Sequence, residues 1–301
     1  MSAPGTETVS APAKLAGKLA ARKGDVWILL SAASFSTIPI FGAYGRSAGV
    51  KTLPMLAWRF ILAIAALWIF LALARRLTRL PAWRVTGFLG MGLLYVVMTS
   101  LYFGALRFTA VSTLTLLFYT YPAFVTLLAT VFLKEPLTRI KLMALLLALS
   151  GCLIVLRPRE VGDWRGALLA LTASVLYSAY MLAGTRLTRG VDPFLTTAWI
   201  MSATAAAFVA AALLRGEMGS VRGGEAWGVI LGLALVATVM ADGSFFAGLP
   251  LTGASRAAIL STIEPLCTLL LSALLLGEAI PPVRFLGGVL IVGSVVLIHR
   301  E

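Results

Sequence analysis

The chain contains few charged residues and few of the side chains that usually carry catalytic chemistry. Only 12% of its 301 residues are charged, and it has one His and two Cys. The sequence contains no H-E-x-x-H motif, no cluster of Cys and His, and no nucleotide-binding P-loop. These absences argue against an enzyme and against direct use of ATP. We therefore predict a protein that is not an enzyme and that uses no cofactor and no metal ion.

Apolar residues dominate the chain instead. They make up 60% of the sequence, and the mean hydropathy is +0.97. So little polar material could not cover the surface of a soluble protein of this size. A helix needs about 20 apolar residues to cross the hydrocarbon core of a membrane. The segments of suitable length are 26–45, 53–74, 85–106, 108–132, 139–156, 164–184, 193–214, 226–248, 253–276 and 282–299.

These segments predict an all-α polytopic membrane protein with ten transmembrane helices joined by short connections, such as Leu249-Pro250. The 25 Lys and Arg outnumber the 12 Asp and Glu. Basic loops favour the cytoplasmic side of a membrane, and Arg75, Arg76, Arg79 and Arg84 share one early loop. We therefore predict that both termini are cytoplasmic. Because the basic residues lie in separate loops beside apolar spans, we expect contact with membrane lipid and no nucleic-acid binding.

Two parts of the chain repeat the same pattern 143 positions apart. The repeated residues are Thr109, Ser112, Pro122, Glu135 and Arg157, which recur as Thr252, Ser255, Pro265, Glu278 and Arg300. A weaker match of Ala57-Trp58 with Ala198-Trp199 extends each copy to five spans. Such repeats within a membrane protein are typical of transporters, whose substrate site lies at the repeat interface.

The repeat divides the chain into four parts. We predict a cytoplasmic tail at 1–24, a first five-helix repeat at 25–156, a linker at 157–163 and a second five-helix repeat at 164–301. Because five is an odd number, the second repeat must cross the membrane in the opposite direction from the first. The predicted fold is therefore two inverted five-helix repeats around a central cavity.

The ten spans and the repeated Thr-x-x-Ser … Pro … Glu hairpin resemble the drug/metabolite transporter superfamily, EamA type. The resemblance covers residues 25–299 and is greatest with the bacterial aromatic amino-acid exporter branch. It implies a multi-pass protein of the bacterial inner membrane, with a cavity lined by the first, third, fourth, sixth, eighth and ninth spans. We expect such a protein to act as a monomer.

Glu264 lies at the centre of the ninth span. A carboxylate at that depth is costly, about 2.5–3.5 kcal/mol on insertion scales for Asp. We expect Glu264 to face the cavity, where it would bind a substrate amine or carry a coupling proton. A protonated Glu264 that bonds to a neighbouring helix is the structural alternative.

The other charged residues of the spans are expected to act differently. Asp242 and Arg256 flank the connection between the eighth and ninth spans, so we predict a salt bridge between them that breaks during transport. Binding of a substrate carboxylate by Arg256 is the alternative. Arg59, near the start of the second span, is expected to extend to the membrane interface and to have no role.

Tyrosine residues are expected to form the cavity wall, where their rings would stack on a substrate or contact its amino group. The candidates are Tyr95, Tyr102, Tyr119, Tyr121, Tyr177 and Tyr180. Helix packing and a belt of Tyr at the membrane interface are the structural alternatives. Pro39, Pro122 and Pro265 are expected to kink their spans, either as gating hinges or as fixed bends.

These observations predict a transporter that exports amino acids by alternating access. The expected substrates are aromatic and other neutral amino acids, handled with broad specificity. The alternative substrates are other small metabolites or drugs, and a channel is the alternative mechanism. Proton antiport and uniport are equally consistent with the residues.

Overall fold

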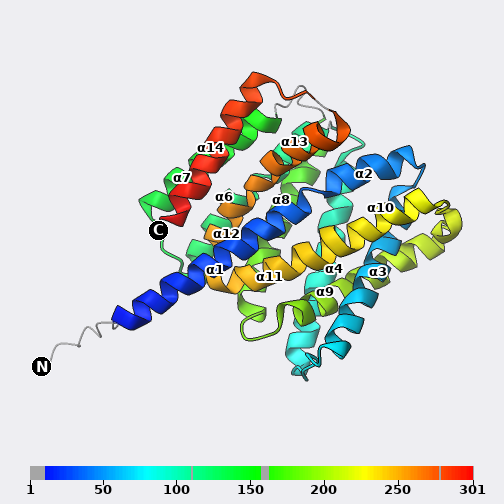
Figure 1. Cartoon of the computed structure of the whole chain (residues 1–301), viewed down its shortest axis with the longest axis horizontal. Coiled ribbons are helices and arrows are strands. Elements are labelled where there is room, and N and C mark those ends of the chain that lie inside the picture. Colours follow the sequence, from blue (N-terminus) through cyan, green and yellow to red (C-terminus); the bar gives the residue numbers. More distant parts are fainter. Residues whose placement is uncertain (1–10, 110, 157–162, 278, 301) are drawn as a thin grey trace, which may run out of the picture.

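The computed structural model describes residues 11–109, 111–156, 163–277 and 279–300, and every regular element there is helical (Figure 1). The α-helices are α1 (Ala11–Phe35), α2 (Ile38–Ser47), α3 (Thr52–Leu73), α4 (Ala82–Ala105), α5 (Val111–Phe118), α6 (Tyr121–Leu128), α7 (Arg139–Leu156), α8 (Trp164–Leu187), α9 (Pro193–Leu214), α10 (Gly224–Ala234), α11 (Ala241–Thr252), α12 (Ala254–Ser261), α13 (Ile263–Leu276) and α14 (Pro282–His299). Two π-helical segments, η1 (Ala129–Leu133) and η3 (Leu235–Met240), and a short 3₁₀ turn, η2 (Met218–Ser220), complete the order.

Ten helical stretches in the described part of the chain are long and apolar enough to cross a membrane. They are Arg22–Ser47, Thr52–Leu73, Ala82–Ala105, Thr113–Leu133, Arg139–Leu156, Trp164–Leu187, Pro193–Leu214, Gly224–Thr252, Ala254–Leu276 and Pro282–His299. The prediction of an all-α membrane protein with ten spans is therefore confirmed. Many large apolar side chains remain on the outer surface, among them Leu73, Leu214 and Leu274, which is typical of a surface in contact with lipid.

The ends of some spans differ from the prediction. Helix α1 begins at Ala11, so residues 11–24 of the predicted tail are helical. The connection predicted at Leu249-Pro250 is wrong, because both residues lie within α11. The turn is instead at Gly253, whose φ of +82° is readily adopted only by glycine. Residues 1–10, the linker segment 157–162 with Arg157, and Glu278 lie outside the described residues.

The helices pack in pairs that correspond between the two halves of the chain. Helix α1 packs along α11, as α4 packs along α8, so the first span pairs with the eighth and the third with the sixth (Figure 1). The fifth and tenth spans, α7 and α14, pack on each other, and so do the second and seventh, α3 and α9. This pattern fits two five-span units. Their boundaries and their opposite orientation in the membrane stay predictions.

Each of the three predicted proline kinks coincides with an interruption of a span. The break between α1 and α2 precedes Pro39, the break between α5 and α6 precedes Pro122, and the break between α12 and α13 precedes Pro265. Proline lacks an N–H donor and its ring clashes with the carbonyl four residues earlier, so the helix ends just before it and restarts around it. The bends are present, and a hinge role for them stays a prediction.

Small residues allow α4 and α9 to approach closely. A Cβ atom added at Gly92 would lie 2.3 Å from the Ile200 carbonyl oxygen, whereas one added at Gly90 would meet nothing within 4 Å. The Thr204 hydroxyl also donates to the Gly92 carbonyl at 3.2 Å.

We therefore expect Gly92→Val to lower the thermal stability of the purified protein, because overpacking typically costs about 1–3 kcal/mol. The melting temperature in detergent would measure the loss. Gly90→Val, on the same helix, is the matched control and should melt close to the wild type. Equal melting temperatures for the two variants would show that α4 and α9 can separate at no cost.

Candidate functional site

A cavity of about 650 Å³ lies among the helices of both halves. The residues that line it are Ile38, Pro39, Leu56, Arg59, Phe60, Tyr95, Met98, Thr99, Tyr102, Phe103, Val111, Thr115, Phe118, Tyr119, Val155, Leu156, Glu264, Pro265, Thr268, Leu269, Ser272 and Arg284. The first, third, fourth and ninth spans contribute as expected. The sixth and eighth contribute no described lining residue, whereas the second, fifth and tenth do.

The cavity lies toward one end of the bundle. Val111 opens α5, Leu156 closes α7 and Arg284 lies in the first turn of α14, and all three belong to the wall. These helix ends share one side of the bundle with the end of α4 and the start of α3. The start of α1 and the end of α14 lie at the opposite side, where a hydrogen bond joins Asp25 to His299.

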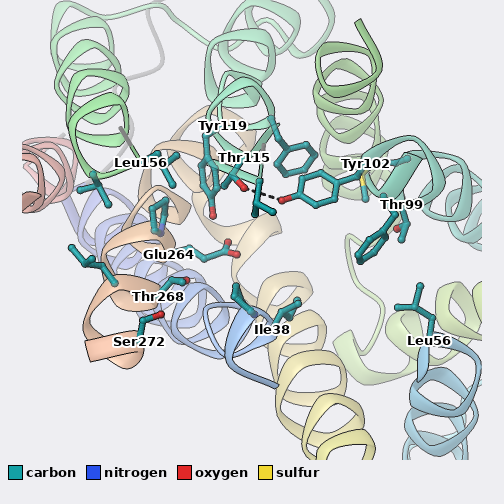
Figure 2. A pocket seen from close by; sticks show the side chains of 18 of the residues that line it. Ile38, Leu56, Thr99, Tyr102, Thr115, Tyr119, Leu156, Glu264, Thr268 and Ser272 are labelled. Atoms are coloured by element: carbon teal, nitrogen blue, oxygen red, sulfur yellow. Dashed lines mark hydrogen bonds between the residues drawn. The ribbon is translucent and has the colours of Figure 1, made fainter. Parts of the chain in front are cut away.

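Glu264 reaches into the cavity from the first turn of α13. Helix α13 begins at Ile263 after the break at Thr262, and the positive end of a helix favours a carboxylate. Thr268 and Ser272 follow at intervals of one turn and line the same wall, and the Tyr119 hydroxyl points toward Glu264 (Figure 2). The site therefore combines one carboxylate with hydroxyl groups.

Three of the six predicted tyrosines line the cavity: Tyr95, Tyr102 and Tyr119. The hydroxyl of Tyr102 is 3.1 Å from that of Thr115, which fixes the ring against α5 (Figure 2). The rings of Phe60 and Tyr95 meet edge to face, with centroids 6.1 Å apart. One wall of the cavity is thus aromatic and carries hydroxyl groups.

The other three tyrosines do not belong to the cavity wall. Tyr121 and Tyr180 are 2% and 1% exposed, and Tyr177 packs between them, with ring centroids 4.8 Å from Tyr121 and 6.0 Å from Tyr180. The helical spacing that predicted Tyr177 and Tyr180 as one face is present, but this face packs on other aromatic rings. Tyr180 packs on Tyr95 and Tyr177 packs on Phe118, so they form a second layer outside the lining residues.

Arg59 is buried, contrary to the prediction that it extends to the membrane interface. The side chain is only 4% exposed, and it lines the cavity. Its Nε donates to the Thr238 hydroxyl at 2.7 Å, and its Nη2 donates to the Ala237 carbonyl at 2.7 Å. The π-helical turn of η3 presents both acceptors toward α3, so Arg59 turns into the bundle.

The predicted salt bridge between Asp242 and Arg256 is wrong. Arg256 instead forms a bidentate pair with Asp25, with Nε and Nη2 at 2.8 and 2.5 Å from the carboxylate oxygens. Because α11 continues to Thr252, Asp242 lies about 15 Å along the helix from the turn that Arg256 follows. Asp242 is buried, and one of its carboxylate oxygens, Oδ2, has no hydrogen-bond partner among the described residues.

Polar contacts close the end of the bundle opposite the cavity. Asp25 from α1 also accepts a 2.6 Å hydrogen bond from the His299 ring at the end of α14. It therefore joins α1, α12 and α14. Glu135, after η1, accepts hydrogen bonds from the backbone N–H groups of Ala254 and Ser255 at 2.8 and 3.3 Å. Glu135 thereby caps the first turn of α12, which belongs to the other half of the chain.

Sequence reasoning missed three of these residues. Asp25 lies at the polar border of the first span and His299 at the end of the last, so neither position distinguishes a buried contact from a solvated one. Arg59 carries a long side chain whose direction depends on the neighbouring helix. For Glu135, by contrast, its recurrence in the repeat already marked the position.

Comparisons with known proteins agree with the fold. The sequence model of the EamA-like transporter family matches the chain twice, at residues 22–157 and 164–300. An uncharacterized transporter of Archaeoglobus fulgidus is 26% identical over 280 residues, which cover 93% of this chain and 97% of the relative. The uncharacterized transporter YyaM of Bacillus subtilis is 23% identical over 246 residues, which cover 78% of this chain and 80% of the relative.

A solved crystal structure shares the fold, with a TM-score of 0.77 and 22% sequence identity over 94% of this chain and 96% of that one. The two matches of the family model together cover nearly the whole described chain and leave the cavity residues within them. The chain therefore belongs to the EamA-like transporter family and is a multi-pass membrane transporter.

Proposed function

We propose that this transporter exports neutral amino acids, with aromatic ones favoured, across the bacterial inner membrane. The observation that carries the proposal is Glu264, a carboxylate that faces a cavity lined mainly by aromatic, aliphatic and hydroxyl side chains, with Arg59 and Arg284 as the basic residues of its described lining. An amino group would pair with the carboxylate, and an aromatic side chain would pack on the Tyr95 and Tyr119 rings. A cavity of about 650 Å³ is in the range of small-molecule sites.

In alternating access, the end of the bundle that is open and the end that is closed would change places. With the termini in the cytoplasm, the cavity lies toward the outside, and the contacts of Asp25, Arg256 and Glu135 close the inside. Corresponding packing pairs in the two halves would give an inward-open state of similar energy, in which those contacts are broken. The three proline breaks lie beside or within the cavity wall, where a change of helix direction would alter its access.

Uptake of labelled amino acids into proteoliposomes tests this function. We expect saturable uptake of phenylalanine, together with counterflow when unlabelled phenylalanine is inside, since a channel gives no counterflow. Uptake that requires an imposed pH gradient would indicate proton coupling, and uptake without it would indicate a uniporter. Absence of uptake for every amino acid would refute the proposal and favour other small metabolites or drugs.

A further inference from the structure

Among the described residues, no carboxylate forms a hydrogen bond or a salt bridge with Arg59. Both hydrogen-bond acceptors of its guanidinium are neutral, the Thr238 hydroxyl and the Ala237 carbonyl. Arg59 forms no ion pair with any carboxylate in the described part of the chain, although Arg256, Lys141 and other cations do form such pairs. A buried cation that lines a cavity without a counter-ion is expected to be neutralised by what enters the cavity.

The π-helical segment η3 holds the guanidinium in one orientation. Thr238 accepts from Arg59 and donates its own hydroxyl proton to the Leu233 carbonyl at 3.0 Å, so its position is fixed from both sides. π-Helical turns are rare and occur frequently at functional sites. The two hydrogen bonds use Nε and one N–H of Nη2, so a carboxylate would bind bidentately through Nη1 and the second N–H of Nη2.

Attachment of α3 to η3 does not by itself require a positive charge. A neutral Gln, whose amide nitrogen lies at about the position of Nε, could donate to the Thr238 hydroxyl without the cost of burying an ion. The neighbouring acid, Asp242, is buried two residues after η3 and interacts electrostatically with Arg59, but the two side chains form no direct salt bridge. Arg59 therefore has an acid nearby but no carboxylate in direct contact, so a ligand carboxylate can pair with it directly.

We infer that Arg59 binds a carboxylate group of the transported molecule, so that the substrates are carboxylates and not simple amines. This inference rests on the proposed transport of small molecules through this cavity and names their chemical class. Glu264, on α13, and Arg59, on α3, then form two subsites of opposite charge in one aromatic cavity. Arg256, for which carboxylate binding was the alternative to a salt bridge with Asp242, is instead paired with Asp25.

Three related probes separate the two subsites: phenylalanine, phenylacetate, which lacks the amine, and phenethylamine, which lacks the carboxylate. Binding to the purified full-length protein would be measured as the concentration of each probe that gives half-maximal thermal stabilisation. We expect Arg59→Gln to weaken the binding of phenylalanine and of phenylacetate about 10- to 100-fold, because hydrogen bonds to charged groups are strong. Binding of phenethylamine should not weaken.

Two further variants make the result specific. Arg59→Lys keeps the charge without the planar fork. It should weaken phenylacetate binding less than Arg59→Gln does, by about 3- to 10-fold. Arg215→Gln removes an exposed Arg just after α9 and should change nothing. If Arg59→Gln does not fold, wild-type binding of phenylacetate by Arg59→Lys would overturn the inference. If Arg59→Gln does fold, unchanged phenylacetate binding would also overturn the inference. Equal weakening of the binding of all three probes would do the same.

The outcomes also separate this inference from the proposed function. Binding of phenylacetate without uptake of any amino acid would refute amino-acid transport and leave the Arg59 subsite intact. Uptake of phenylalanine by a wild-type protein that does not bind phenylacetate, together with normal uptake by Arg59→Gln, would refute the Arg59 subsite alone.

Discussion

Replacing Glu264 with Gln is expected to weaken binding and transport of amino acids about 10- to 100-fold. Glu264 is the only carboxylate among the residues known to line the cavity. The amide of Gln has nearly the same shape, but it offers no charge to an ammonium group, and a hydrogen bond to a charged group contributes about 1.5–3 kcal/mol. Proteoliposome uptake of phenylalanine, with and without a pH gradient, measures both the loss and the coupling.

Glu225→Gln is the matched control for this experiment. Glu225 lies exposed in the first turn of α10, away from the cavity wall, so its replacement should leave uptake unchanged. N-acetylphenylalanine, which has no ammonium group, provides a second comparison and should bind the wild type and Glu264→Gln equally weakly. Uptake by Glu264→Gln that equals the wild type in rate and in pH dependence would exclude Glu264 from both binding and coupling.

Removing the positive charge of Arg256 is expected to open the end of the bundle where Asp25, Arg256 and His299 meet. Asp25 is only 1% exposed, and the bidentate pair with Arg256 satisfies both carboxylate oxygens. Loss of one partner from a buried ion pair costs about 3–5 kcal/mol. This cost applies only to the state in which the pair exists, so Arg256→Gln should shift the population about 100-fold or more toward the alternative state.

Thiol labelling can measure this shift. In a protein whose two native cysteines, Cys152 and Cys267, are replaced by Ser, a single Cys at Ala257 would report access to α12. Because Ala257 is fully buried, labelling should be slow in the wild-type background and at least about 10-fold faster with Arg256→Gln. Arg189→Gln, an exposed Arg in the turn after α8, should label as slowly as the wild type.

The charge-swapped double variant distinguishes gating from general stabilisation. Asp25→Arg combined with Arg256→Asp should restore slow labelling if the two residues act as a pair, because the coupling of contacting residues is not additive. A lower melting temperature of Arg256→Gln with unchanged labelling would show that the cluster stabilises the fold and does not control access.

The spans and their interruptions were predictable because they depend on neighbouring residues. About 20 consecutive apolar residues suffice to cross a membrane whatever their partners, so the ten spans follow from hydropathy. Pro122 and Pro265 interrupt their helices because the proline ring excludes a local hydrogen bond. Glu264 was identified for a similar reason, since a carboxylate in the middle of an apolar span is unusual wherever it points.

The partners of the charged side chains depend on the rotation and axial position of helices far apart in the sequence. The sequence by itself determined the membrane class, the ten spans, the repeated pattern and the unusual position of Glu264. Only the tertiary structure decided that Arg256 pairs with Asp25, 231 positions away, and that Arg59 reaches the π-helical turn at Thr238. A turn displaced from Leu249-Pro250 to Gly253 rotates every later side chain of α12, because each residue advances about 100° around a helix. Hydropathy constrains the length of a span, whereas packing alone sets its rotation.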